Sequence, residues 1–493
     1  MLDEAFALFL KAAPATVLIR GVLENIFSVG RLNAIFEDAA QSQYTRDLAF
    51  SSVVRLMSQV VMRIQPSVHS AYRQQAEELG VSAKCVYDKL DGIEPEVSQE
   101  LVRRLAREME LVIRTMGGAL PPRVEGLRTR ILDGNHLSAT DRRLGALRGQ
   151  AGAALPGQSL AVLDPELRLI VDLFPCEDAH TQERALLGQV LHTVQAGDLW
   201  IEDRNFCTTS FLFGVHQRNA FFIVRQHAKS LRWEPVGEFV YVGEIARGQV
   251  FEQQVRLRDE HGGELVVRRI RIDLNEPTRD GETVIHLLTN LRPEQADALR
   301  VAELYSDRWQ VETAFQELTV DLACEVSTLG YPKAALFAFA TAVSCYNAFS
   351  VTKAALRAAA VELAPCVPTA SEPGIAPAAC RASNCQPAAP PLGKPASTAA
   401  RSAVDDLSTY YLADEIAGTW RGMMVVLPDD FWERKFAALA PPELARNLMD
   451  LARGADLSKY QKRPRSRKPS RRVPPRKPGS HVSTARILPD HKR

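Results

Sequence analysis

The sequence predicts a mixed α/β fold in which a strand-bearing centre lies between helical N- and C-terminal parts. Apolar residues recur at steps of three and four through residues 1–120, which is typical of packed helices. From residue 130 to about 290, short apolar runs alternate with turn residues, which indicates strands. Helical spacing returns after residue 293 and continues to residue 458, interrupted by one proline- and alanine-rich stretch.

The first helical part contains a segment with the spacing of a helix-turn-helix unit. In Gln75–Leu90, Gly80 permits a turn and Ser82 is suited to cap the helix that follows. Lys84 and Lys89 on this second helix are then candidates for contact with DNA. Ordinary helical bundles share the same spacing, so a purely structural helix pair is the alternative.

Two aspartates follow apolar strand patterns in the centre of the chain. Asp133 comes after Thr129–Leu132, and Gly134 is expected to allow a sharp exit from the strand. Asp203 comes after Leu199–Ile201 and Glu202. If the two strands are neighbours in one sheet, both carboxylates emerge at the same edge. Taken singly, each aspartate is more ordinarily a turn or cap residue.

Strand patterns continue through residues 220–290, and helices are expected at Ala302–Leu318 and Ala334–Leu356. The second of these helices is rich in alanine, but its interior Ser344 and Asn347 favour a core helix over a membrane span. Trp420 and Trp432 are expected to anchor the core of the C-terminal helical part.

The most informative residues are Tyr305, Arg308 and Glu312. Their spacing of three and then four places all three on one face of a single predicted helix. A phenol, a guanidinium and a carboxylate are together suited to grip a phosphate beside a metal ion. The alternative is a solvated helix face with an intrahelical Arg–Glu pair.

Asp133, Asp203 and Glu312 together have the chemistry of a metal-dependent nuclease. Phosphodiester cleavage requires an activated oxygen nucleophile and neutralisation of the leaving oxygen, and two Mg²⁺ ions supply both. Mg²⁺ prefers carboxylate and water ligands, so three acids from separate elements form the simplest site.

These motifs resemble those of bacterial insertion-sequence transposases of the DDE type. Ile-Leu-Asp133-Gly, Ile-Glu-Asp203-Arg-Asn-Phe and Tyr305-x-x-Arg308-x-x-x-Glu312 are similar to the insertion-sequence-four-like group, which carries a Tyr-Arg-Glu-Lys signature. The resemblance extends from about Arg130 to Ala340. The chain departs from the signature at Thr319, which stands seven residues after Glu312 where the Lys is expected.

The resemblance implies a ribonuclease-H-like core interrupted by a mainly β insertion. It also implies cutting of double-stranded DNA at element ends with Mg²⁺, for which Mn²⁺ can substitute, followed by strand transfer into target DNA. In this interpretation Asp133, Asp203 and Glu312 hold the metal, and Tyr305 and Arg308 position phosphate. Synapsis of paired ends predicts that the protein forms a homodimer on DNA. The expected location is the bacterial cytoplasm, in association with the nucleoid.

The expected organisation has five parts. They are a helical DNA-binding domain (1–122), the transposase core (123–360, with its insertion at about 216–292), a disordered linker (361–404), a helical segment (405–460) and a basic tail (461–493). The tail holds twelve of the 60 Lys and Arg residues and a single acid, which suits non-specific phosphate contact or simple solvation.

The eight cysteines contain no Cys-x-x-Cys pair, so free thiols in a reducing compartment are expected rather than zinc. The N-terminus has no signal-peptide pattern, and no apolar run is long enough for a membrane span.

Two further functions remain open, namely a catalytically inactive DNA-binding derivative, suggested by Thr319, and a hydrolase that never joins strands. Trp233 in the insertion is expected either to stack on a base or to pack in a strand.

Overall fold

The computed structural model describes residues 1–43, 47–141, 144–227, 231–278, 281–363, 407–463 and 481–488. The predicted linker lies outside these residues from position 364 onward, as do Cys366, Cys380 and Cys385. Most of the predicted basic tail also lies outside them.

The N-terminal part is helical, as the apolar spacing predicts. Its helices are α1 (Leu2–Ala12), α2 (Pro14–Ile26), α3 (Val29–Ala39), α4 (Phe50–Val61), α5 (Val68–Leu79), α6 (Ala83–Gly92) and α7 (Pro95–Thr115). In α4 the residues spaced by three and four, including Val53, Met57 and Val60, are buried. Burial of such stripes is what stabilises short helices of this kind.

A large mixed sheet occupies the centre of the molecule. Its first strands are β1 (Arg128–His136), β3 (Gln158–Asp164), β4 (Leu169–Cys176), β5 (Asp198–Glu202) and β6 (Phe221–Arg225). Along the sheet the order is β4-β3-β1-β5-β6; β4, β3 and β1 pair antiparallel, whereas β1, β5 and β6 pair parallel. β3 and β4 form a hairpin whose connection contains Pro165 and Glu166.

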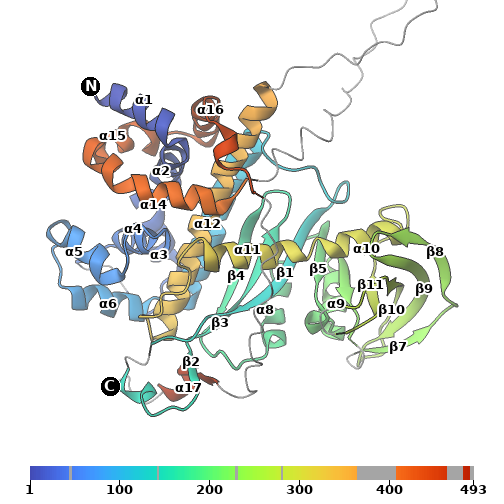
Figure 1. The fold of residues 1–493 in the computed structure, drawn as a ribbon. Coiled ribbons are helices and arrows are strands. Elements are labelled where there is room, and N and C mark those ends of the chain that lie inside the picture. The colour runs from blue at the N-terminus through green and yellow to red at the C-terminus, as the bar shows by residue number, and fades with distance from the viewer. Residues whose placement is uncertain are drawn as a thin grey trace, which may run out of the picture.

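The same sheet continues into the strand-rich region. Its further strands are β7 (Arg232–Pro235), β8 (Val240–Ile245), β9 (Gly248–Arg258), β10 (Glu264–Leu274) and β11 (Val284–Thr289). β11 pairs with β6, so hydrogen bonding runs without a break from the core strands into this region. In Figure 1 these strands gather beyond α10, away from the N-terminal helices.

Different helices cover the two faces of the core strands. Ile131, Ala161 and Ile201 face a large apolar cluster that includes α7 and α12 (Pro332–Leu363). Leu132, Leu160 and Trp200 face a second cluster with α8 (Leu187–Leu191) and α9 (Thr209–Gln217). Short 3₁₀ turns at Glu183–Leu186 and Arg204–Phe206 precede these two helices.

The long helix α12 joins the parts of the molecule. It contacts α2, α4 and α7 of the N-terminal part, β4 of the sheet and α16 of the C-terminal part. Its length and apolar composition would suit a membrane crossing, but its most apolar window is wholly buried inside the protein. The predicted core role of this helix is therefore confirmed, with Asn347 bonded to both backbone polar groups of Ile170 on β4.

The C-terminal part packs back onto the rest of the chain. It comprises α14 (Thr409–Val426), α15 (Asp429–Trp432), a π-helical turn (Glu433–Ala437) and α16 (Pro441–Ala452), followed by β12 (His481–Ser483) and α17 (Thr484–Ile487). Trp420 and Trp432 are buried in the main cluster, as expected. β12 pairs in parallel with β2 (Ala153–Leu155), so this piece of the predicted tail is structured.

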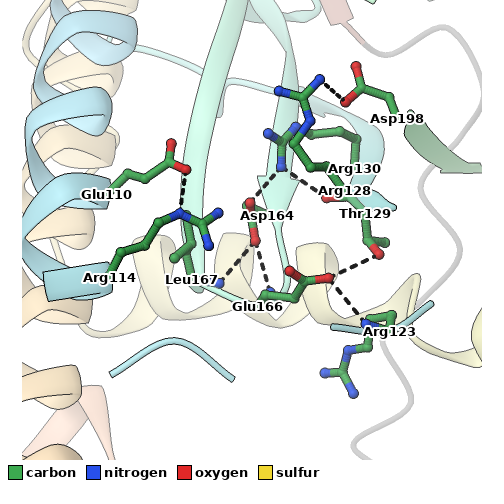
Figure 2. A network of polar contacts seen from close by, with 10 residues as sticks. All are labelled: Glu110, Arg114, Arg123, Arg128, Thr129, Arg130, Asp164, Glu166, Leu167 and Asp198. Atoms are coloured by element: carbon green, nitrogen blue, oxygen red, sulfur yellow. Dashed lines mark hydrogen bonds and ion pairs between the residues drawn. The ribbon is translucent and has the colours of Figure 1, made fainter. Parts of the chain in front are cut away.

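A network of charged residues fixes the beginning of β1. Figure 2 shows Arg130 donating to Asp164, and the second oxygen of Asp164 accepting from the backbone of Glu166 and Leu167. Beside it, Arg128 pairs with Asp198 at 2.9 Å. These contacts tie the β3–β4 turn and the start of β5 to one end of β1.

Candidate active site

The parallel pairing of β1 and β5 brings the two predicted aspartates together. Leu132 lies beside Glu202 in the register, and Asp133 and Asp203 follow on their respective strands. The prediction that these strands are neighbours is therefore confirmed. Asp203 directly follows the last residue of β5, as expected.

The predicted exit from the strand at Gly134 is wrong. β1 continues to His136, because Asn135 and His136 still pair with Ser159 and Gln158 of β3. The glycine has a different role, since an added Cβ would lie 1.9 Å from a carboxylate oxygen of Glu183.

The single helix predicted at Ala302–Leu318 is two helices. Tyr305 lies in α10 (Ala298–Ser306), Arg308 precedes the first residue of α11, and Glu312 lies in α11 (Trp309–Val320). Around the break, the Arg308 amide bonds to the Tyr305 carbonyl and the Val311 amide to that of Arg308, a tighter spacing than in an α-helix. The backbone at Arg308 stays right-handed, so its side chain is kept on the side of the other two.

The structure brings all five predicted site residues into one group. Arg308 donates to Asp133 at 2.9 Å and to Glu312 at 2.7 Å. The Tyr305 hydroxyl donates to Asp203 at 3.3 Å. In Figure 1, α10 and α11 pass in front of β1 and β5.

Three carboxylates and one guanidinium leave this group with an excess of negative charge. Burial raises the pKa of Asp133 to about 6, although Arg308 and the Gly134 amide oppose the shift. Burial and the neighbouring Asp203 carboxylate also raise the pKa of the Tyr305 phenol far above its ordinary value. Tyr305 is therefore a hydrogen-bond donor at neutral pH.

The donor set has the chemistry of a site for a hard divalent cation. Carboxylate oxygens are the ligands that Mg²⁺ prefers, and a cation would relieve the cost of burying Asp133 that its raised pKa reports. Among the described residues, however, no three His, Cys, Asp or Glu side chains converge closely enough to hold a metal ion. Arg308 stands between Asp133 and Glu312, so it occupies the place where their oxygens would meet a metal.

Two arginines that the sequence reasoning did not assign lie beside the group. Arg204 follows Asp203 in the chain, and Arg225 is close enough to Tyr305 to act on the pKa of its phenol. Both pair with Glu282, which precedes β11. The sequence could have indicated Arg204, because it belongs to the Asp-Arg-Asn-Phe segment quoted above. No motif in the sequence indicates Arg225.

Glu202 is a third residue near the site to which the sequence pattern assigned no role. It is fully buried, neither of its oxygens has a hydrogen-bond partner, and burial raises its pKa well above the ordinary value. It precedes Asp203 but points to the opposite face, among Leu132 and Val224. The alternation of side chains along β5 could have predicted which face of the sheet Glu202 lies on, but not that its carboxylate has no hydrogen-bond partner.

The helix-turn-helix geometry is present in α5 and α6. Gly80 ends α5 with a left-handed backbone at φ 62°, and the Ser82 hydroxyl caps α6 by accepting from the Cys85 amide. Lys84 is exposed and pairs with Asp88. Lys89 instead turns inward, with its ammonium 3.9 Å from the centre of the Phe36 ring.

The remaining predicted groups have ordinary structural surroundings. Trp233 packs against the second apolar cluster, and Arg269 lies over its ring at 4.4 Å, which favours the packed interpretation. Thr319 is exposed, and its hydroxyl bonds back to the Phe315 carbonyl of its own helix.

Comparison with known proteins identifies a family model that covers the centre of the chain. Residues 125–347 match the family model described as the transposase DDE domain, and this range contains all five residues of the group. The match supports a DDE transposase, a class of enzymes that generally uses divalent metals. No curated protein matches the chain.

Among solved structures, the chain is similar to a piggyBac transposase in a synaptic complex with hairpin DNA. The sequence identity is 10%, and the alignment covers 88% of this chain and 85% of that one. The TM-score of 0.35 is too low for this likeness to establish a shared fold.

Proposed function

We propose that this protein is the DNA transposase of an insertion sequence, which cuts at element ends and joins them to target DNA. The observation that carries the proposal is the convergence of Asp133, Asp203 and Glu312 on Arg308 and Tyr305. The match of residues 125–347 to the transposase DDE domain supports it independently. The resemblance to the insertion-sequence-four-like group rests on the quoted motifs and is part of the proposal.

The catalytic core is proposed to be ribonuclease-H-like. The strand order β4-β3-β1-β5-β6, with three antiparallel strands followed by two parallel additions, supports this assignment. Asp133, Asp203 and Glu312 would hold Mg²⁺ or Mn²⁺, which supplies an activated oxygen nucleophile and stabilises the leaving oxygen.

The protein's own side chains have distinct tasks in this proposal. Arg308 balances two of the acids before metal binds, and its guanidinium is suited to bind phosphate when the acids are engaged elsewhere. The Tyr305 hydroxyl holds Asp203 in place through its hydrogen bond. Lys84 on the exposed side of α6 supports DNA binding by the N-terminal helices.

The partners follow from the same proposal. They are the double-stranded DNA of element ends and target, and a second copy of the chain in a paired-end complex. The bacterial cytoplasm, in association with the nucleoid, is the corresponding location.

The alternative is a catalytically inactive DNA-binding protein derived from such an enzyme. Thr319 favours it, because the signature cation is absent from α11. A supercoiled plasmid carrying the element ends, incubated with the protein and Mn²⁺, separates the two functions. Nicking at the ends that Glu312→Gln lacks supports the transposase, and normal end binding without nicking supports the alternative. Strand-transfer products further exclude a hydrolase that never joins strands.

A further inference from the structure

Arg63, from the N-terminal helices, lies at the far end of the helix that carries Glu312. Its guanidinium donates to the carbonyl of Val320, the last residue of α11, at 2.7 Å. One step away, the Ala323 amide donates to the Val61 carbonyl at 2.7 Å. Two hydrogen bonds therefore fix the end of α4 against the end of α11, and Figure 1 shows α11 extending from the N-terminal helices to α10.

Arg63 contacts α11 next to Thr319, because it bonds to the residue that follows Thr319. Thr319 stands seven residues after Glu312, which is two helical turns, so both side chains lie on the same face about 10 Å apart. Between Arg308 and Lys333 the chain contains no Lys or Arg. Because Arg63 bonds to the residue after Thr319, it supplies positive charge at the position where α11 itself has none.

Arg63 forms no ion pair with a carboxylate of the described residues. The side chain is exposed, and within the described ranges no acid lies at ion-pair distance from it. Arg308 differs, since it is buried and already paired with two acids. A single bond to the carbonyl end of a helix orients the Arg63 guanidinium and leaves most of its donors facing solvent.

The backbone at Arg63 is held in an uncommon conformation. Its φ is 59°, in the left-handed region that L-residues other than Gly, Asn and Asp rarely adopt. Such a conformation is unfavourable for a residue with a Cβ and persists where the surroundings impose it. Glycine is the residue that adopts this conformation most readily, so it can replace Arg63 without changing the backbone.

We propose that Arg63 binds a DNA backbone phosphate beside Thr319, so that the N-terminal part supplies the cation that α11 lacks. This inference rests on the proposed function. Thr319 and Glu312 are about 10 Å apart along α11, a distance equal to the rise of about three base pairs along a duplex axis. The phosphate belongs either to the element end or to the target, and both sources offer the same chemistry.

The test uses three variants of the full chain, Arg63→Gly, Thr319→Lys and the two combined. Glycine keeps the positive φ, so the loop conformation is retained while the cation is lost. Lysine at position 319 returns a cation to the same place from α11. Arg421→Ala is the matched control, because Arg421 donates to the carbonyl of Ile64, the residue next to Arg63.

Affinity is measured without metal by fluorescence anisotropy, on an element-end duplex and on an unrelated duplex, over a range of salt concentrations. Arg63→Gly is expected to weaken binding roughly five- to tenfold and to reduce the slope of log affinity against log salt by about one phosphate contact. Thr319→Lys restores both in the double variant, and Arg421→Ala leaves both unchanged. If Arg63→Gly loses affinity only for the element-end duplex, the phosphate belongs to the element end. If it loses affinity for both duplexes, Arg63 contacts the backbone of any DNA, including the target.

An unchanged affinity and salt slope in Arg63→Gly would overturn the inference, as would a double variant that is not restored. This failure is distinct from failure of the proposed function. If Arg63→Gly weakens binding but no nicking depends on Glu312, the phosphate contact stands and the transposase proposal fails. If the wild-type chain binds neither duplex, both fail.

Discussion

The two ends of strand β1 carry charged residues in opposite proportions. At its beginning, the arginines and acids drawn in Figure 2 are equal in number, and Arg130 and Arg128 are each matched to an aspartate. Five residues along the strand from Arg128, three acids gather near a single arginine: Arg308 pairs with Asp133 and Glu312, and Asp203 accepts from Tyr305. Balanced pairs reduce the cost of burying charge, whereas a crowd of carboxylates raises it. The first end therefore stabilises the fold, and the second keeps an unfavourable arrangement that suits it to bind a cation.

The largest expected effect comes from removing an acid at the crowded end. In the proposed function Glu312 is a metal ligand, so Glu312→Gln should lower the rate of end nicking on the order of 1,000-fold. Asp133→Asn should do the same. Because burial disfavours the charged form of Asp133, as its raised pKa reports, Asp133→Asn should not lower the free energy of unfolding, and chemical denaturation measures this directly. Wild-type nicking in both variants would contradict the site.

The balanced end should respond in the reverse manner. Arg130→Met leaves the Asp164 carboxylate buried without its ion pair and should lower the free energy of unfolding by about 3 kcal/mol. Nicking per folded molecule should be unchanged. A loss below 1 kcal/mol, on the order of an exposed pair, would mean that this end is not the stabilising one.

Glu202 tests the cost of burying a carboxylate with no partner. Glu202→Leu should raise the free energy of unfolding by about 2 kcal/mol at pH 7. The folded pKa of Glu202 lies above its ordinary 4.5, so the wild-type penalty is absent below that pH and grows as the pH rises. Glu202→Gln should therefore remove part of the decline in stability between pH 4.5 and 7. Identical pH profiles for the Glu202→Gln variant and wild type, compared by urea denaturation, would count against a neutral buried Glu202.

The smallest effect is expected from an exposed pair in Figure 2. Arg114 and Glu110 are one turn apart on α7 and partly solvated. Arg114→Ala should lower the free energy of unfolding by no more than about 0.5 kcal/mol, a value that 0.5 M salt should largely remove. Thermal melts at low and high salt measure it.

The sequence was sufficient for the parts of the site that local pattern controls. Asp133 and Asp203 were found because apolar runs precede them, and Tyr305, Arg308 and Glu312 because their spacing fits one helix face. The break before α11 was not predicted, since it arises from how two helices pack over the sheet. The inward turn of Lys89 depends on Phe36 in another helix, and the isolation of Glu202 depends on three strands. These features follow from contacts between distant residues, which spacing does not encode.

The position of α12 has a consequence for how the chain is made. α7 buries one side against this helix, which begins only at Pro332. During synthesis, the N-terminal helices therefore leave the ribosome long before the surface that covers them exists. A fragment ending near residue 122 would expose that apolar side and is expected to aggregate or bind chaperones. The proposed DNA binding by α5 and α6 is for this reason best studied in a chain that extends at least through α12.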